Sequence, residues 1–214
     1  GVDGGEMHVY QRSLTVDTAT SSGALLAYQL NGGPLPPQHG FPLRVVVPRW
    51  YGMTNVKWLT SISAVDEPFN GYQQRQSYRL RQEADEVGEP LSRIYPRSLM
   101  VPPGIPEFMS RTRLVSPGPC DLFGRAWSGK APIAAVEVSV DGGTTWAAAE
   151  LEPPTDPGAW IGWRYQWDAV PGDYELCSRA TDGEGNTQAA QPTWNRGGYV
   201  NNSFHRIPVQ VHEA

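Results

Sequence analysis

Residues 133–148, IAAVEVSVDGGTTWAA, decide the fold class of this chain. The valines from Val136 to Val140 alternate with Glu137 and Ser139, and successive side chains of a β-strand point to opposite faces of a sheet. The Asp-Gly-Gly that follows is a strong signal for a hairpin turn. This stretch therefore predicts two antiparallel strands, with the valine face turned toward a core.

Further strand patterns lie on both sides of this hairpin. LFGRAWS at 122–128, YELCSRATD at 174–182 and HRIPVQVH at 205–212 have strand composition. WIGWRYQW at 160–167 places Trp163, Tyr165 and Trp167 on one face. About seven short strands in about 100 residues, separated by turns, predict an immunoglobulin-like β-sandwich. No long helical pattern interrupts them, which disfavours a parallel α/β sheet.

The first 112 residues are less regular. A short helix is expected near Asp17–Ser22, and strands are expected in ALLAYQL at 24–30, LRVVV at 43–47 and VKWLTSISAV at 56–65. Residues 66–112 carry many charges and prolines. Because proline removes a ladder hydrogen bond, this segment is expected to be a linker or a sheet edge.

The composition excludes several classes of protein. Only 18% of the 214 residues are charged, so a packed core is expected. The net charge of −5 argues mildly against a nucleic-acid partner, and no apolar run reaches the roughly 20 residues of a membrane span. With only Cys120 and Cys177, a disulfide framework is not expected, although a single bridge between them stays open. No CxxC or HExxH motif is present, which disfavours a closed zinc site.

Three cationic or titratable side chains gather in HGFPLR and the following NVKW, namely His39, Arg44 and Lys57. Arginine offers a planar fork of donors for phosphate, lysine a point charge, and a glycine loop lets backbone N–H groups approach an anion. The pattern is typical of a pocket for a phosphorylated or polyanionic ligand. The alternative is three ordinary surface or capping residues.

Two long blocks resemble one enzyme family. LLAYQLNGGPLPPQHGFPLRVVVP at 25–48 and GMTNVKWLTSI at 52–62 resemble the second half of the molybdopterin domain of sulfite oxidases and assimilatory nitrate reductases. WSGKAPIAAVEVSVDGGTTW at 127–146 and PTWNRGGYVNNSFHRIPVQV at 192–211 resemble the dimerisation domain of the same enzymes. The resemblance covers nearly the whole chain and implies a mainly β protein, with part of a molybdopterin domain followed by an immunoglobulin-like sandwich.

The resemblance implies a Mo-molybdopterin cofactor and a set of residues that bind it. His and Arg of the family's HGxPxR and Lys of its VKW contact the pterin and its phosphate, and a serine in an upstream Y-x-x-S segment lies beside them. Carried over, the cofactor-binding residues are His39, Arg44, Lys57 and Ser13, with the backbone of Asn55 and Val56.

Two further residues are implied at the substrate. Sulfite oxidases have a tyrosine about 21 residues after the VKW lysine, where nitrate reductases usually have asparagine. That spacing from Lys57 gives Tyr78, which would hydrogen-bond the substrate or couple proton movement to electron transfer. The alternative is a tyrosine packed at a domain seam. Arg196 is a candidate for steering the anion.

The sequence departs from the family pattern in three places. The cysteine that ligates molybdenum belongs to the first half of the family's molybdopterin domain, and neither Cys120 nor Cys177 can replace it. We therefore expect this polypeptide alone not to bind molybdenum. The substrate-binding arginine of animal sulfite oxidases, in W-N-x-R-G, corresponds to Gly197, because the arginine here comes one residue earlier. The family's glycine after VVVP is Arg49.

These expectations combine into one prediction. Residues 1–90 form the C-terminal part of a molybdopterin-binding domain, 91–112 a proline-rich linker, and 113–214 the dimerisation domain. The parent enzyme oxidises a small oxyanion such as sulfite, forms a homodimer through the C-terminal domain, and passes electrons to an external cytochrome or another acceptor. The alternatives are nitrate-reductase-type activity in the parent enzyme, or a non-catalytic immunoglobulin-like dimerisation module.

Overall fold

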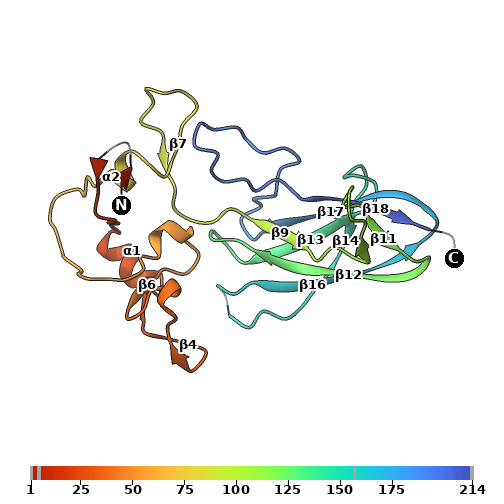
Figure 1. Cartoon of the computed structure of the whole chain (residues 1–214), viewed down its shortest axis with the longest axis horizontal. Helices are drawn as coiled ribbons and strands as arrows, with labels where there is room; N and C mark the ends of the chain where they lie inside the picture. The colour runs from red at the N-terminus through yellow and green to blue at the C-terminus, as the bar shows by residue number, and fades with distance from the viewer. Residues whose placement is uncertain (1, 4–5, 157, 213–214) are drawn as a thin grey trace. The chain divides into compact units, whose positions relative to one another are not determined.

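A computed structural model describes residues 2–3, 6–156 and 158–212 (Figure 1). The chain divides into two compact units. An N-terminal unit comprises Gly1–Ile94 together with Trp194–Tyr199, and a sandwich unit comprises Tyr95–Thr193 and Val200–Ala214. The protein is mainly β, as the sequence predicted. The domain boundaries expected at residues 90 and 113 stay a prediction.

Two sheets form the sandwich unit. One has six strands in the order β10-β11-β18-β17-β13-β14, and the other has four in the order β15-β16-β12-β9. All neighbours are antiparallel except β11 and β18. The strands are β9 (Arg97–Met100), β10 (Ile105–Pro106), β11 (Arg113–Val115), β12 (Gly118–Trp127), β13 (Ile133–Ser139), β14 (Ala147–Ala148), β15 (Glu150–Leu151), β16 (Ile161–Ala169), β17 (Gly172–Asp182) and β18 (Arg206–Val211).

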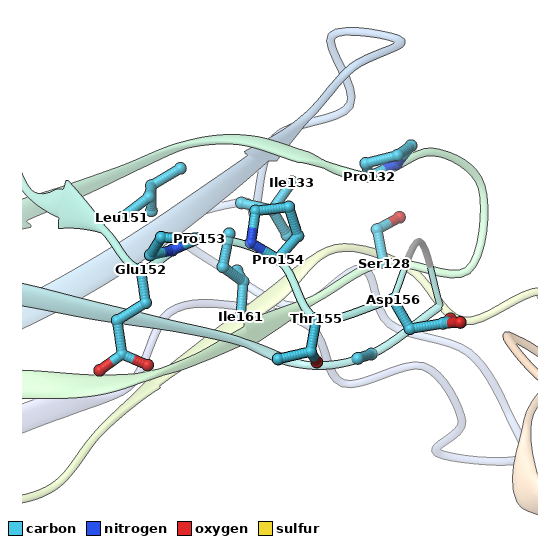
Figure 2. A pocket seen from close by; sticks show the side chains of 11 residues that line it. Ser128, Pro132, Ile133, Leu151, Glu152, Pro153, Pro154, Thr155, Asp156 and Ile161 are labelled. Atoms are coloured by element: carbon cyan, nitrogen blue, oxygen red, sulfur yellow. The ribbon is translucent and has the colours of Figure 1, made fainter.

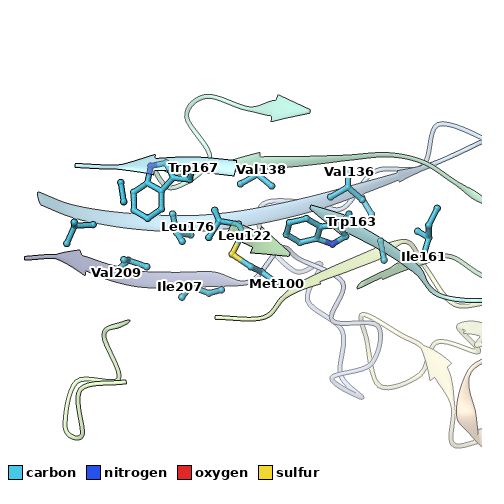
Figure 3. Packing of buried hydrophobic residues seen from close by; sticks show 14 residues of the cluster. Met100, Leu122, Val136, Val138, Ile161, Trp163, Trp167, Leu176, Ile207 and Val209 are labelled. Carbon is cyan, nitrogen blue, oxygen red and sulfur yellow. The ribbon is translucent and has the colours of Figure 1, made fainter. Parts of the chain in front are cut away.

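The inner faces of both sheets supply one apolar core (Figure 3). Leu122 on β12 and Trp163 on β16 come from the four-stranded sheet, and Val136 and Leu176 come from β13 and β17 of the other. All four are at most 1% exposed. Because burying such a side chain contributes about 1.5–3 kcal/mol, this core accounts for much of the stability of the unit.

The predicted alternation and hairpin are confirmed. Val136 and Val138 are buried whereas Glu137 is half-buried, and β13 pairs with β14 across the Asp-Gly-Gly turn. Ser139 is an exception at the strand end. It is buried, and its hydroxyl accepts from Gly143 N at 2.8 Å, so its polarity is satisfied inside the turn.

The proline-rich segment supplies sheet edges, as expected. β9 is the outer strand of the four-stranded sheet, and β10 is the outer strand of the six-stranded sheet. Both precede the region where the sandwich strands were predicted to begin.

Short elements connected by long turns make up the N-terminal unit. Its first helix, α1, confirms the helix predicted near Asp17–Ser22. Thr15 caps this helix by accepting a hydrogen bond from Thr18 N at 3.1 Å. The elements are β1 (Val2–Asp3), β2 (Glu6–Met7), α1 (Val16–Ser21), β3 (Leu25–Ala27), β4 (Gln29–Leu30), β5 (Gly33–Pro34), η1 (Pro37–His39), β6 (Arg44–Val46), η2 (Gly52–Thr54), α2 (Tyr72–Arg75), β7 (Arg79–Leu80) and β8 (Glu89–Pro90).

The strand predicted at 56–65 is wrong. Trp58 has φ 51, which turns the chain out of the extended conformation. Val56 O accepts from Val45 N at 2.9 Å and Leu59 N donates to Leu43 O at 2.9 Å, but the described ladder does not continue beyond them. The apolar side chains of Ile62 and Val65 are instead exposed, at 68% and 65%.

The two cysteines lie in different sheets and are free thiols. Cys120 is on β12 and Cys177 is on β17. Burial raises the pKa of the Cys177 thiol to about 11. Within the ranges that the structure describes, no helix is long and apolar enough to cross a membrane, and no group of three or more His, Cys, Asp or Glu is arranged to hold a metal ion.

Candidate cofactor and substrate site

Arg44 and Lys57 converge on the last two residues of η1. Arg44 Nη1 donates to His39 O at 3.0 Å, and Lys57 Nζ donates to Gln38 O at 3.0 Å. Gly40 ends η1 with φ 108, and a Cβ there would lie 3.0 Å from Lys57 Cβ and 3.2 Å from Arg44 Cβ. Only glycine combines that backbone conformation with such close neighbours. We call Gln38–Gly40, Arg44 and Lys57 the cation cradle.

The cation cradle has an unpaired hydrogen-bond donor and no acidic residue near it in the sequence. Arg44 Nε is buried and has no hydrogen-bond partner. An unsatisfied buried donor costs about 1–3 kcal/mol and so calls for an acceptor. Residues 18–65 contain no Asp or Glu. The cradle is therefore suited electrostatically to an anion, and the predicted residues Arg44, Lys57 and His39 do come together.

His39 is an exposed residue of this group, as are Gln38 and Lys57. His39 is the last residue of η1, its backbone carbonyl accepts from Arg44, and its side chain is open to a ligand. His39 thus binds Arg44 through its backbone carbonyl, while its exposed side chain is available to a ligand.

Asn55 and Val56 hold the neighbouring turn. Asn55 Oδ1 accepts from Val47 N at 2.6 Å, and the Asn55 N–H donates to Gly52 O at 3.0 Å. Val56 N donates to Thr54 O at 3.0 Å. Since both backbone donors are used within the chain, these residues position Lys57, and their direct contact with a cofactor stays a prediction.

Arg49 explains why the family has glycine at its position. Its φ is 68, which lies in the left-handed region. A non-glycine residue there costs on the order of 1–2 kcal/mol. The turn is held because Arg49 O accepts from Ile94 N at 3.0 Å, and the side chain is half-buried.

A second group of side chains surrounds Tyr78. The Tyr10 hydroxyl lies close enough to Tyr78 to affect its own pKa, the Tyr199 ring lies 5.7 Å from the Tyr78 ring between centroids, and Arg12 Cζ lies 5.6 Å from the centroid of the Tyr78 ring. Burial, followed by the proximity of Tyr78, raises the pKa of Tyr10 to about 12. We call Tyr10, Arg12, Tyr78 and Tyr199 the tyrosine cluster.

Ser13 follows Arg12 of the tyrosine cluster in the chain, and its contact with a cofactor stays a prediction. Gln74 on α2 binds it twice: its Nε2 donates to Ser13 Oγ at 2.9 Å, and its Oε1 accepts from Ser13 N at 3.1 Å. Tyr10 Oη donates to Met53 O at 2.5 Å, and Met53 lies in η2, the turn that ends at Asn55. This hydrogen bond connects the two groups within one unit.

The loop that carries Arg196 is closed by Asn195. Its Nδ2 donates to Tyr199 O at 2.8 Å, and its Oδ1 accepts from Tyr199 N at 3.0 Å. Arg196 N donates to Arg81 O at 2.9 Å, which fastens the loop to the N-terminal unit, while the Arg196 side chain is exposed.

Tyr199 occupies the space that a side chain at position 197 would need. A Cβ on Gly197 would lie 2.5 Å from Tyr199 Cε2, closer than atoms approach without displacement. The same ring packs against Tyr78. The glycine at 197 and the tyrosine at 199 are therefore mutually dependent.

Sequence reasoning missed Tyr10, Arg12, Gln74 and Tyr199. The Y-x-x-S spacing drew attention to Ser13 and already contained Tyr10 and Arg12. Tyr199 carried no signal, because its importance depends on a contact with a residue more than 100 positions earlier.

The sandwich unit contains a pocket of about 580 Å³ (Figure 2). Pro153 and Pro154 border it together with Ile133 and Ile161, so its lining is mainly apolar. Glu152, at its rim, is already engaged by Arg125 Nη1 at 2.8 Å. The pocket presents no group of side chains that suggests catalysis.

Comparison with known proteins places the chain in a family. Residues 97–212 match the Mo-co oxidoreductase dimerisation domain, and residues 1–73 match the oxidoreductase molybdopterin binding domain. The chain belongs to the sulfite oxidase family of Mo-co oxidoreductases. Molybdopterin is thus the cofactor of the family to which this chain belongs.

Relatives within this family differ in activity. The chain is 36% identical to mitochondrial sulfite oxidase of Mus musculus, over 87% of this chain and 36% of that protein. It is 32% identical to nitrate reductase [NAD(P)H] of Hordeum vulgare, over 94% of this chain and 25% of that protein. The sulfane dehydrogenase SoxCD from Paracoccus pantotrophus has a similar structure, with a TM-score of 0.77 and 26% identity over 100% of this chain and 56% of that one. The chain spans about a third of the length of the mammalian sulfite oxidases that it matches.

Proposed function

We propose that this chain forms one side of the Mo-molybdopterin site, together with the dimerisation domain, of an enzyme that oxidises a small oxyanion such as sulfite. The observation that carries the proposal is the cation cradle, where Arg44 and Lys57 meet over Gly40 and Arg44 Nε has no partner. Electrons would pass to an external cytochrome or another acceptor.

The residues of the cradle fit an anionic, phosphate-bearing cofactor. Arg44 would offer its planar fork to a phosphate and Lys57 a point charge, while His39 would donate from the exposed edge of η1. Arg44 and Lys57 would compensate the negative charge of such a ligand, because residues 18–65 contain no Asp or Glu to pair with them. Bound there, the molybdenum cofactor would supply the redox chemistry, and the protein the binding and the electrostatic field.

Tyr78 is the residue of this chain that we assign to the substrate. Its ring contacts the Tyr199 ring and the Arg12 guanidinium, and these two neighbours restrict its position. A positioned phenol can hydrogen-bond an oxyanion or move a proton as electrons leave. Arg196 lies on an exposed side of its own loop, from which it would attract anions to the site.

A second candidate substrate is a sulfane sulfur. SoxCD matches the whole of this chain, and Gly197 stands where animal sulfite oxidases have their substrate-binding arginine. Nitrate reduction is a third candidate, since a nitrate reductase is among the relatives, but the tyrosine at 78 favours the sulfur-oxidising branch.

A homodimer through the sandwich unit is part of the proposal. The hairpin between β10 and β11 exposes Ile105, Phe108 and Met109, with 68%, 77% and 82% of each residue accessible. Apolar side chains this exposed on a sheet edge are typical of a protein interface. Phe108→Asp is expected to raise the dimer dissociation constant at least tenfold by analytical ultracentrifugation, whereas a value unchanged for Phe108→Asp would place the interface elsewhere.

Cofactor retention tests the cradle. In the enzyme that contains this chain, Arg44→Ala is expected to lower the molybdenum and pterin content of the purified protein. Arg75→Ala, an exposed arginine on α2, is the matched control and should keep its full content. If Arg44→Ala retains as much cofactor as Arg75→Ala, the assignment is wrong.

Steady-state assays with sulfite, nitrate and a sulfane substrate distinguish the candidate reactions. We expect sulfite oxidation with an artificial electron acceptor, and a large loss of kcat in Tyr78→Phe with little change in molybdenum content. Turnover of only the sulfane substrate would replace sulfite with the second candidate, and turnover of only nitrate would contradict the sulfur-oxidising assignment.

A further inference from the structure

Arg12 is a partly buried cation held by Gln73 and Tyr78, which are close to each other but lie more than 60 positions after it in the chain. Its Nη1 donates to Gln73 O at 2.9 Å on α2, and its Cζ lies 5.6 Å from the centroid of the Tyr78 ring. The backbone contact and the ring together restrict the guanidinium to one orientation. An arginine held in this way is pre-organised for a ligand, because little side-chain freedom remains to be lost on binding.

The charge of Arg12 has no counter-ion among the described residues. Burial lowers the pKa of Arg12, and among the described residues the proximity of Tyr10 and Tyr78 opposes this effect. Arg12 Nε is buried without a hydrogen-bond partner. Removing a cation from water is costly unless it is paired and hydrogen-bonded, so this arrangement indicates an anion that completes it.

The neighbouring loop explains why an arginine is needed here. An arginine at position 197 would collide with the Tyr199 ring, which packs against Tyr78 from the side of that loop. Arg196, the neighbouring residue, is exposed. Arg12 is therefore the guanidinium that the structure places against Tyr78.

We propose that Arg12 binds the substrate oxyanion beside Tyr78 and takes the place of an arginine at position 197. The inference rests on the proposed function, because Tyr78 is the substrate residue there. Its Nε, which has no partner, and its Nη2 would form a two-pronged contact with an oxyanion while Nη1 stays on Gln73 O. Specificity for a small oxyanion would then come from Arg12 and Tyr78 acting on the same ligand.

Inhibition by sulfate tests this directly, since sulfate is an unreactive oxyanion. In the cofactor-loaded enzyme, Arg12→Gln is expected to raise both KM for the substrate and the inhibition constant for sulfate roughly tenfold or more, as loss of a charge-assisted contact implies. Arg12→Lys should restore part of the affinity. The matched control Arg75→Gln should leave both constants unchanged, and molybdenum content should be equal in all of these variants.

Two results would overturn the assignment. One is an inhibition constant for sulfate in cofactor-loaded Arg12→Gln that stays within about twofold of the parent value. Loss of a bidentate contact would weaken sulfate binding by more than that. The other is a tenfold weakening in Arg196→Gln without one in Arg12→Gln, which would transfer the role to Arg196.

A measurement on the unsubstituted enzyme guards against a variant that fails to fold. Phenylglyoxal modifies arginine, and mass spectrometry reports the extent at each site. Sulfate is expected to slow modification of Arg12 severalfold and to leave Arg75 unaffected; equal rates at Arg12 with and without sulfate would contradict the proposal. An enzyme that lacks molybdenum would defeat the proposed function, while the sulfate protection would still report on Arg12.

Discussion

Gly40→Ala should weaken cofactor binding because its methyl group would displace Arg44 and Lys57. The same substitution at a second glycine distinguishes this effect from backbone strain. At φ 108, an alanine costs about 1–3 kcal/mol of local strain. Its methyl group would also stand 3.0 Å from Lys57 Cβ and 3.2 Å from Arg44 Cβ, which forces these two neighbours outward by a few tenths of an ångström. The cradle would then lose the geometry of its charge-assisted contacts.

The expected size follows from those contacts. A hydrogen bond to a charged group contributes about 1.5–3 kcal/mol, so misplacing one corresponds to roughly a 10- to 100-fold loss of cofactor affinity. Gly32→Ala is the matched control, because Gly32 has φ 81 in the same unit and nothing lies within 4 Å of its Cβ position. Both variants should lose thermal stability through backbone strain, Gly40→Ala the more because of its close contacts, whereas only Gly40→Ala should lose cofactor.

The assay is molybdenum by mass spectrometry and pterin by fluorescence, each per protomer, after a fixed dilution and wash. Equal cofactor content in Gly40→Ala and Gly32→Ala would refute the reasoning, because it would show that the positions of Arg44 and Lys57 do not matter to retention.

Three further predictions concern the core and the titrating groups. Leu122→Ala removes a fully buried side chain and should lower the free energy of unfolding by about 2–5 kcal/mol in urea, whereas Leu99→Ala, at a side chain that is 37% exposed, should cost clearly less; equal losses would contradict the described core. The raised pKa of Tyr10, about 12 against an ordinary 10, means that its contribution to stability is complete below pH 10 and is lost as pH rises toward 12. A spectrophotometric titration should therefore show a tyrosinate component near 12 that Tyr10→Phe lacks, and its persistence in that variant would assign it elsewhere. At pH 8 Cys177, with a pKa of about 11 and no exposed surface, should react with a thiol reagent much more slowly than the half-buried Cys120; faster labelling of Cys177 would show that β17 opens readily.

The sandwich was predictable because its signals are local. Alternation with a period of two, as from Val136 to Val138, places side chains on a face wherever the strand lies, and the Asp-Gly-Gly turn determines how the next strand returns. The strand predicted from the composition of residues 56–65 is absent from the structure. Trp58 there has a positive φ, and its ring N–H donates to Pro37 O at 2.9 Å, a contact between distant residues that no local pattern predicts.

The candidate site likewise has one part that the sequence predicts and one part that it does not. Arg44 and Lys57 could be predicted to meet, because a short glycine loop and its cations lie close together in the sequence. The tyrosine cluster could not, since Arg12, Tyr78 and Tyr199 come from three distant segments and meet only in the folded unit. The departure at Gly197 was visible in the sequence, but its cause became clear only from the position of the Tyr199 ring.

A crystal structure of the cofactor-loaded enzyme that contains this chain tests the central claim most directly. The quantity to measure is the distance from Arg44 Nε, now without a partner, to the nearest phosphate oxygen of the cofactor. The cation cradle predicts a hydrogen bond of about 2.7–3.2 Å, with Lys57 Nζ on the same phosphate. A cofactor bound with its phosphate beyond direct contact of both Arg44 and Lys57 would contradict the account.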